Sequence, residues 1–300
     1  MSSANASLPI IETLVSTNWK DYELIDSGNS QKLERYGPYT LVRPEPQAIW
    51  LPVLSEKKWS SAQAVFESAD EENGGHFRFQ SAMDHRWIMQ YNGLKFWGGI
   101  SSSRHLGVFP EQAVQWDWIS NQVNSSNHPL KVLNLFGYTG IASLAAAKAG
   151  ASVTHVDASK KVITQARENQ SLSEMDALPI RWIVDDALKF VEREARRQST
   201  YDGLILDPPK FGRGPKGEVW EFYRLLPVLL SQCRKILSSQ PMFIVITAYA
   251  IQASSLTLFF TLRDIMRDFK GRLSIGELVT IEKSAGRAIS NAIFARWSGL

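Results

Sequence analysis

The residues from 131 to 157 constrain the fold of this chain more than any other segment. An apolar run, Val132 to Phe136, leads into a turn with two glycines and then into the alanine-rich stretch IASLAAAKAGA. A second apolar run, Ser152 to Val156, follows and ends on Asp157. This pattern predicts a strand, a tight turn, a helix and a second strand parallel to the first.

The turn and the acid that follows it indicate a binding site for a nucleoside. Gly137 and Gly140 lack side chains, so the turn can approach a ligand closely, and Asp157, 20 residues after Gly137, suits a pair of ribose hydroxyls. The turn reads G-Y-T-G, which departs from the G-x-G-x-x-G of nicotinamide sites and from the G-x-x-x-x-G-K-[ST] of phosphate-binding loops. A cofactor with ribose and adenine but no pyrophosphate, such as S-adenosylmethionine, fits better.

Strand-like and helix-like segments alternate from residue 130 to residue 270, which is typical of a parallel sheet with helices on both faces. The chain closes with two strand-like runs, 275–283 and 288–297, joined by the turn SAGR, which predict an antiparallel hairpin. The expected fold class is therefore α/β, with a doubly wound, mostly parallel sheet of seven strands. The other expected strands are 131–136, 152–156, 180–184, 203–206 and 242–248, with helices at 139–149, 159–172, 186–197, 219–237 and 253–269.

The first hundred residues have a different texture. Alternating runs such as HFRFQ and RWIMQYNGLKFWGGI predict a small β-rich domain, and Asn92-Gly93 between two runs indicates a hairpin turn. The segment FPEQAVQWDWISNQV has helical spacing and leads into the second part. We expect a β-rich N-terminal domain at 1–108, a candidate for substrate recognition, and a cofactor-binding domain at 109–300.

Composition narrows the class of protein further. The chain has 300 residues, 44% of them hydrophobic, and a formal net charge of +3, which permits an RNA partner without demanding one. Its one cysteine, Cys233, excludes an internal disulfide and fits a cytoplasmic protein, and the N-terminus lacks the pattern of a signal peptide. The apolar stretch 242–260 contains Gln252 and several hydroxyl side chains, so we expect a buried strand and a helix there rather than a membrane span.

A second motif, DPPKF at 207–211, directly follows the apolar strand GLIL. Ligands of open parallel sheets bind beyond the carboxyl ends of the strands, so this motif should face the same crevice as Gly137. Two prolines stiffen the backbone and remove N–H donors, which leaves the Asp207 carboxylate and nearby carbonyls as acceptors. Such a cluster can hold an amino or ring N–H of a planar group, on which Phe211 could stack.

The motifs NLFGYTG, HVDAS, VDDA and DPPKF, in this order and spacing, resemble those of class I S-adenosylmethionine-dependent methyltransferases. More narrowly, the chain is similar to the bacterial branch that methylates bases of large-subunit ribosomal RNA. The resemblance covers residues 104–300 and includes the segment SSSRHLGVFPEQ. It implies a seven-stranded methyltransferase sheet, S-adenosylmethionine as the cofactor and ribosomal RNA as the substrate.

The resemblance also implies where the cofactor binds. Asp157 would take the ribose hydroxyls, Ala158 and Ser159 would flank the adenine, and Asp186 would address the adenine amino group, with Asp185 as a neighbour. Asp186 also stands where an N-cap of the next helix is expected, and both roles are compatible. The expected cofactor-binding residues are Phe109, Asn134, Phe136, Gly137, Tyr138, Thr139, Gly140, Asp157, Ala158, Ser159, Asp186, Ala187 and Asp207.

The acceptor side and a covering segment follow from the same resemblance. Arg104, Phe109 and Gln112 match a segment that folds over the cofactor in relatives, although Ala113 replaces an arginine common there. The expected catalytic residues, which would hold the acceptor base, are Asp207, Pro208, Pro209, Lys210 and Phe211.

The expected chemistry is an in-line displacement that needs no metal, because the sulfonium methyl is already activated. The five histidines lack metal-ligand spacing. Methylation of cytosine C5 requires a thiolate, and where such relatives carry it, near Ala250, this chain reads TAYAIQ. Cys233 has the apolar spacing of a core thiol, so methylation of a base nitrogen is favoured.

Three other functions remain open from the residues alone. A protein or small-molecule N-methyltransferase would use the same acceptor cluster, and a non-catalytic RNA-binding protein could retain the fold. A dehydrogenase fits the turn poorly. Arg213 and Lys216, beyond DPPKF, could meet RNA phosphates, whereas Arg263 and Arg267 alternate with acids in the manner of a solvated helix face.

Overall fold

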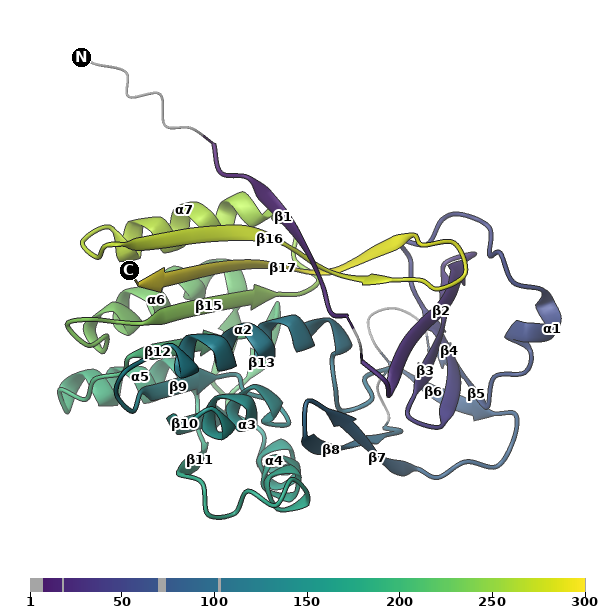
Figure 1. Cartoon of the computed structure of the whole chain (residues 1–300), viewed down its shortest axis with the longest axis horizontal. Helices are drawn as coiled ribbons and strands as arrows, with labels where there is room; N and C mark the ends of the chain where they lie inside the picture. The colour runs from purple at the N-terminus through teal and green to yellow at the C-terminus, as the bar shows by residue number, and fades with distance from the viewer. Residues whose placement is uncertain (1–7, 18, 70–73, 102–103, 300) are drawn as a thin grey trace.

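The computed structural model describes residues 8–17, 19–69, 74–101 and 104–299, which form one large sheet between helices beside a smaller β-rich part (Figure 1). The large sheet has eight strands in the order β1-β16-β17-β15-β12-β9-β10-β11. Neighbouring strands are parallel except around β17, which runs opposite to all the others. The strands are β1 (Ile11–Val15), β9 (Lys131–Leu135), β10 (Ser152–Asp157), β11 (Ile180–Val184), β12 (Gly203–Leu206), β15 (Phe243–Ala248), β16 (Gly271–Ile281) and β17 (Ala288–Gly299).

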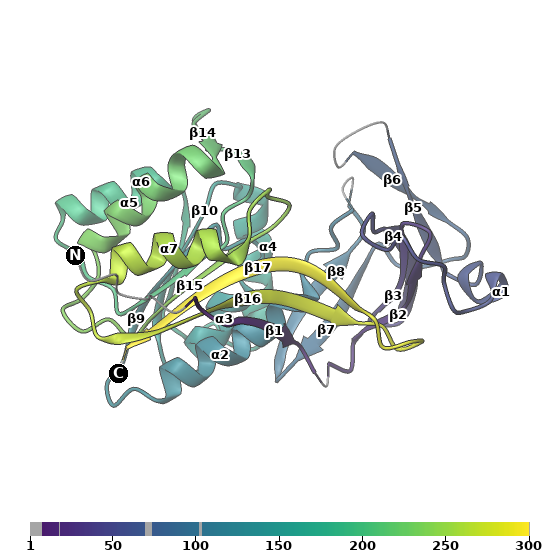
Figure 2. The same ribbon diagram turned by 90° about the horizontal axis from the view of Figure 1, so that it is seen from above.

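Helices cover both faces of the central strands because these strands are apolar on both sides. Helices α2, α3 and α4 lie on one face, and α5, α6 and α7 lie on the other (Figure 2). Successive residues of a strand point to opposite faces of the sheet. Leu133 therefore packs in the core on the α5–α7 side, and Val132 packs in the core on the α2–α3 side. After the short turn η1 (Pro110–Gln112), the helices are α2 (Ala113–Asn124), α3 (Ile141–Lys148), α4 (Lys160–Leu172), α5 (Ala187–Arg196), α6 (Phe222–Lys235) and α7 (Ser255–Met266).

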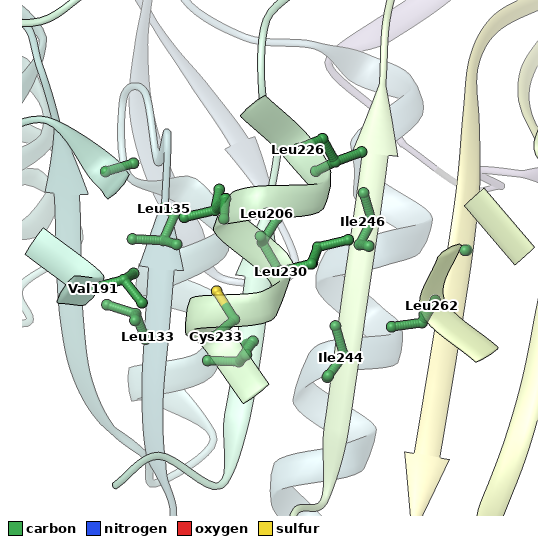
Figure 3. Packing of buried hydrophobic residues seen from close by; sticks show 14 of the residues in the cluster. Leu133, Leu135, Val191, Leu206, Leu226, Leu230, Cys233, Ile244, Ile246 and Leu262 are labelled. Atoms are coloured by element: carbon green, nitrogen blue, oxygen red, sulfur yellow. The ribbon is translucent and has the colours of Figure 1, made fainter. Parts of the chain in front are cut away.

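The core on the α5–α7 side contains the chain's one cysteine. Cys233 of α6 is 1% exposed and lies among side chains such as Leu133, Leu230 and Ile244 (Figure 3). Burial raises the pKa of its thiol to about 12. The prediction of a core thiol, made from the apolar spacing of its helix, is confirmed.

The N-terminal part contains a five-stranded sheet, in the order β2-β3-β4-β5-β6, and the separate hairpin β7–β8. Asn92 and Gly93 have φ values of +44° and +72°, as a tight hairpin turn requires, so this prediction is also confirmed. Trp19 and Trp87 fill an aromatic core that continues onto Trp116 of α2. The elements are β2 (Tyr22–Gly28), β3 (Gln31–Tyr36), β4 (Tyr39–Pro44), α1 (Glu56–Trp59), β5 (Ala64–Ser68), β6 (Gly75–Phe79), β7 (Arg86–Tyr91) and β8 (Leu94–Gly99).

Segments of chain cross between the two parts in both directions. Strand β1, which precedes the N-terminal sheet, pairs with β16 at the edge of the large sheet. The β16–β17 hairpin in turn reaches the N-terminal part (Figure 1), where Ser284 Oγ donates to Asp26 Oδ1 (2.6 Å) and Arg287 Nη1 donates to the Leu51 carbonyl (3.0 Å). The domain division at residue 108 therefore stays a proposal. Wherever the boundary lies, these contacts join the N-terminal part to the large sheet.

The expected strands of the large sheet are all present, and the closing hairpin is antiparallel as expected. Strand β1 adds an eighth, edge strand that the seven-strand expectation did not include, because its partner β16 lies at the far end of the chain. The stretch after DPPKF is a short hairpin, β13 (Phe211–Arg213) with β14 (Val219–Glu221), so α6 begins at Phe222 rather than at residue 219. Within the described residues, no helix has the length and apolar character that crossing a membrane requires.

Candidate active site

The turn between β9 and α3 has an uncommon backbone. Phe136, Tyr138 and Gly140 have φ values of +56°, +50° and +85°. Left-handed values are rare for bulky side chains and cost about 1–2 kcal/mol each, so surrounding contacts must hold the turn in place. At Gly140 an added Cβ would lie 2.9 Å from both the Ala166 Cβ and the Trp182 ring, so only glycine fits the start of α3.

A buried polar chain supports this turn from beneath. Asn134 Nδ2 donates to Ser143 Oγ (2.9 Å), which lies 2.9 Å from Nδ1 of His155. His155 is fully buried, and desolvation lowers its pKa to about 3, so the imidazole is neutral. A Cβ on Gly137 would lie 2.5 Å from this Nδ1. Glycine at 137 is therefore required by a neighbour inside the protein, a reason that the sequence pattern does not reveal.

The Asp157 carboxylate, at the end of β10, is bonded to the turn. Its Oδ2 accepts from the Tyr138 N–H (3.0 Å) and its Oδ1 accepts from the Ser159 N–H (2.9 Å). Burial raises the pKa of Asp157, and the two N–H groups partly offset this effect. Each oxygen can accept one more hydrogen bond, so the carboxylate is able to receive two ligand hydroxyls.

Asp186 lies beside Asp157, at the end of the next strand. The Asp185 N–H donates to the Asp157 carbonyl (3.1 Å), and Asp186 Oδ1 caps α5 by accepting from the Lys189 N–H (2.9 Å). The expectation that Asp186 is an N-cap is confirmed. Ser159 caps α4 in the same manner. The start of α4 therefore borders the Asp157 carboxylate, and the segment leading into α5 contacts the Asp157 backbone.

Asp207, directly after β12, shares a cavity with the turn. Gln112 Nε2 donates to Asp207 Oδ2 (3.0 Å) and thereby joins η1 to this strand end. Burial, reinforced by the nearby Glu111 carboxyl, raises the pKa of Asp207 to about 8. The expected site residues that line this cavity are Phe109, Asn134, Phe136, Gly137, Tyr138, Thr139 and Asp207.

Two further polar side chains at this site were not predicted. Glu111 is 5% exposed, and burial raises its pKa. The buried Tyr249 hydroxyl lies beside Glu111 and Gln112 but makes no hydrogen bond of good geometry among the described residues. The Phe109 ring contacts both Tyr249 (5.1 Å between centroids) and Tyr138 (5.5 Å). In the sequence, only position indicated that Glu111 and Tyr249 belong to this site. Glu111 is close to the expected Phe109, and Tyr249 comes just after the end of an expected strand.

The DPPKF motif divides between the cavity and the surface. Pro208 is buried, whereas Phe211 is 65% exposed on the β13–β14 hairpin. Trp220 anchors this hairpin: its Nε1 donates to the Pro209 carbonyl (2.7 Å), and its ring lies 4.7 Å from that of Phe136. One indole therefore links the exposed hairpin to the strained turn.

Most of the expected residues lie at one edge of the sheet. The cavity, Asp157 and Asp186 occupy the carboxyl ends of the adjacent strands β12, β9, β10 and β11. Other expected residues lie apart: Lys210–Phe211 are on the exposed hairpin, and Ala187 is 4% exposed, which leaves little more than its backbone for a ligand. Arg104 of the expected covering segment does not line the cavity.

The charges at this edge favour a cationic ligand. The buried Glu111 and the half-buried, desolvated Asp207 place two carboxyls close together, and neither forms an ion pair with a described residue. Ionising such unpaired carboxyls is costly, and a cation in the cavity would offset that cost. Within the described part of the chain, no cluster of three or more His, Cys, Asp or Glu residues is arranged to hold a metal ion. A nucleoside with ribose hydroxyls near Asp157 and a positive centre near Asp207 fits these groups.

Comparison with known proteins agrees with this geometry. Residues 77–269 match the family model described as S-adenosylmethionine-dependent methyltransferase. The crystal structure of the SAM-dependent methyltransferase from Agrobacterium tumefaciens is 48% identical, with a TM-score of 0.94 over 98% of this chain and 96% of that one. The crystal structure of SMU.776 complexed with S-adenosylhomocysteine is 19% identical, with a TM-score of 0.69 over 92% of this chain and 75% of that chain, and shows likeness of fold.

Curated relatives match over a smaller share of their own length. Ribosomal RNA large subunit methyltransferase K/L of Pseudoalteromonas atlantica is 32% identical over 247 residues, 75% of this chain and 34% of the relative. Ribosomal RNA large subunit methyltransferase I of Aeromonas salmonicida is 30% identical over 125 residues, 41% of this chain and 31% of the relative. The chain thus spans about a third of the length of these relatives. By its matched residues, strand order and cavity, it belongs to the S-adenosylmethionine-dependent methyltransferases.

Proposed function

We propose that this chain methylates a nitrogen atom of an RNA base, with ribosomal RNA as the substrate. The observation that carries the proposal is that the 136–139 turn and Asp207 line one cavity. The names of the matched ribosomal RNA methyltransferases support the substrate class. S-adenosylmethionine supplies a methyl group already activated on a sulfonium, so the protein's task is to align the two reactants and exclude water.

In this proposal the turn and two strand ends hold the cofactor. The free lone pairs of Asp157 accept the ribose hydroxyls, and Asp186 accepts the adenine amino group at the rim of the site. Phe109 covers the cavity, supported by its ring contacts with Tyr138 and Tyr249. The neutral His155 fixes the underside of the turn and takes no proton.

Asp207 would orient the acceptor base. Without the cofactor, Asp207 is largely protonated at neutral pH, because its pKa is raised to about 8. A cationic cofactor in the cavity would favour the ionised form of Asp207. The ionised carboxylate can accept an N–H of the base, while the carbonyls of the proline pair accept a second. The acceptor nitrogen then points its lone pair towards the methyl group.

A nitrogen acceptor is also supported by the state of the one cysteine. Methylation at cytosine C5 needs a thiolate that adds to the ring. Cys233 is 1% exposed within the α5–α7 core, and its pKa is raised to about 12. Cys233→Ala should therefore retain methyl transfer, whereas loss of turnover in a folded variant would indicate a thiol mechanism.

The β13–β14 hairpin is the proposed contact for the RNA backbone. Lys210, Arg213 and Lys216 are exposed around it, and none pairs with an acid among the described residues. The acids of the hairpin, Glu218 and Glu221, form ion pairs with side chains of α5 and α6 instead. Unpaired cations beside an exposed aromatic ring suit a phosphate backbone with an unstacked base.

The second candidate function is methylation of a protein or small-molecule nitrogen. Incubation with methyl-labelled S-adenosylmethionine and either total RNA or total protein separates the two. We expect label in RNA, and label confined to protein would refute the RNA proposal. Nucleoside mass spectrometry of ribosomal RNA from cells with and without the protein should then reveal one missing N-methylated nucleoside, and a missing 5-methylcytidine would contradict the nitrogen assignment.

A further inference from the structure

A second, polar cavity shares no lining residue with the Asp207 cavity and takes no part in the proposed methyl transfer. It lies next to Trp118 of α2 and has a volume of about 250 Å³, several times the share of one water molecule, which is about 30 Å³. The cavity is lined by Glu12, Trp118, Arg272, Ser274, Arg296 and Ser298.

Four of these residues form a compact block on two neighbouring strands. In the antiparallel register of β16 and β17, Arg272 lies opposite Ser298, and Ser274 lies opposite Arg296. Directly opposed residues share a face of the sheet, and so do residues two apart along a strand. The intervening residue Trp297 packs on the α7 side, so the block faces away from α7. Two arginines and two hydroxyls therefore alternate around a small square.

Arg296 is held rigidly with part of its guanidinium turned to this cavity. It is 7% exposed; its Nε donates to Gln115 Oε1 (2.6 Å) and its Nη2 donates to the Val114 carbonyl (3.1 Å). The guanidinium also stacks 4.8 Å from the centre of the Trp118 ring. Its third nitrogen, Nη1, has no hydrogen-bond partner among the described residues, and Arg296 lines the cavity.

The charges of the cavity are not balanced by the protein. Neither Arg296 nor Arg272 forms an ion pair with a described residue, and Glu12, the acid in the lining, attracts Arg296 without contacting it. Burial lowers the pKa of Arg296 to about 10, which leaves it charged at neutral pH. Two cations and one anion give the cavity one net positive charge, next to two serine hydroxyls able to donate.

We propose that this cavity is a binding site for a phosphate group, formed by Arg272, Ser274, Arg296 and Ser298. Guanidinium groups match the oxygens of phosphate in geometry and charge, and serine hydroxyls complete such sites as neutral donors. Because Gln115 and Val114 fix the buried arginine, its free nitrogen is oriented before the ligand arrives, which limits the entropy lost on binding.

Titration of the full chain with inorganic phosphate tests the proposal, with chloride at equal ionic strength as the reference. We expect saturable heat of binding and a rise in melting temperature that chloride does not reproduce. Arg272→Gln, an exposed change that should not affect folding, should weaken phosphate binding by about tenfold or more, the size of a charge-assisted hydrogen bond. Arg267→Gln, at the C-cap of α7, is the matched control, since it removes the same charge from another exposed position.

The phosphate could belong to a free anion or to an RNA backbone, and two arms distinguish these sources. If an RNA backbone supplies the phosphate, Arg272→Gln also weakens RNA binding and lowers the salt dependence of RNA affinity by about one charge. Free phosphate then no longer competes with RNA in the variant. If the ligand is a free anion, RNA affinity stays unchanged while phosphate binding falls. A phosphate response equal to that of chloride, or one that survives both Arg272→Gln and Arg296→Lys, overturns the proposal.

Discussion

A single methyl group at Gly137 should disturb both stability and cofactor binding. The backbone at this position lies outside the left-handed region, so the effect of Gly137→Ala comes from the added Cβ alone. That Cβ would lie 2.5 Å from Nδ1 and 2.9 Å from Nε2 of His155. The ring has little freedom to move, because it contacts Ser143 Oγ at 2.9 Å and the Trp182 ring at 4.7 Å.

The expected loss of stability follows from this crowding. Overpacking of a rigid core costs about 1–3 kcal/mol. For a chain of this size, such a loss lowers the melting temperature by roughly 2–5 °C. The turn that yields to the new methyl group also carries Tyr138, whose N–H is bonded to Asp157, so affinity for S-adenosylhomocysteine should fall as well. Calorimetry measures both quantities.

A double-mutant cycle identifies His155 as the cause. In a His155→Ala background the clash is absent, so Gly137→Ala should cost almost nothing there, with a coupling energy of about 1–3 kcal/mol. Gly74→Ala is the matched control, since an added Cβ at Gly74 meets nothing within 4 Å. An equal cost of Gly137→Ala in both backgrounds would show that the His155 ring is not the cause of the loss.

Three further predictions concern the cofactor and acceptor sides of the site. Asp157→Ala should weaken S-adenosylhomocysteine binding by about 2 kcal/mol or more in a calorimetric titration, because charged hydrogen bonds to the ribose are lost, and unchanged affinity would remove Asp157 from the cofactor site. The ratio of S-adenosylmethionine affinity to S-adenosylhomocysteine affinity should rise as the pH passes through about 8, because Asp207 ionises there and attracts the sulfonium. Asp207→Asn should abolish the part of this rise that Asp207 causes. An identical pH profile in the variant would contradict a role for the Asp207 charge. Trp220→Phe removes the hydrogen bond to the Pro209 carbonyl but keeps an aromatic ring near Phe136, so KM for RNA should rise while cofactor affinity is preserved; a drop in cofactor affinity alone would show that the indole serves the turn and not the hairpin.

Local patterns predicted the parts of this fold that depend on neighbouring residues. The strands, the closing hairpin and the Asn92-Gly93 turn follow from hydrophobic periodicity and turn chemistry. Strand β1 could not be predicted in this way, because its pairing with β16 joins the two ends of the chain. The β13–β14 hairpin was missed for another reason: its strands are only three residues long and depend on Trp220 as an anchor, and residues 219–221 were placed in the expected helix.

The candidate site shows the same division. The turn and the acids at strand ends were predictable, since parallel strands bring their carboxyl ends to one edge. The reason for glycine at 137 was not, because it lies in the packing of His155 from another strand. Glu111 and Tyr249 were also missed, since nothing in the local sequence shows that their side chains are buried beside Asp207.

The most direct test of the cofactor site is a crystal structure of this protein with S-adenosylhomocysteine bound. We expect the ribose hydroxyls within hydrogen-bond distance of Asp157, the adenine beside Asp186, and the thioether sulfur in the cavity that Asp207 lines. A ligand bound elsewhere, with Asp157 still bonded only to Tyr138 and Ser159, would contradict this expectation.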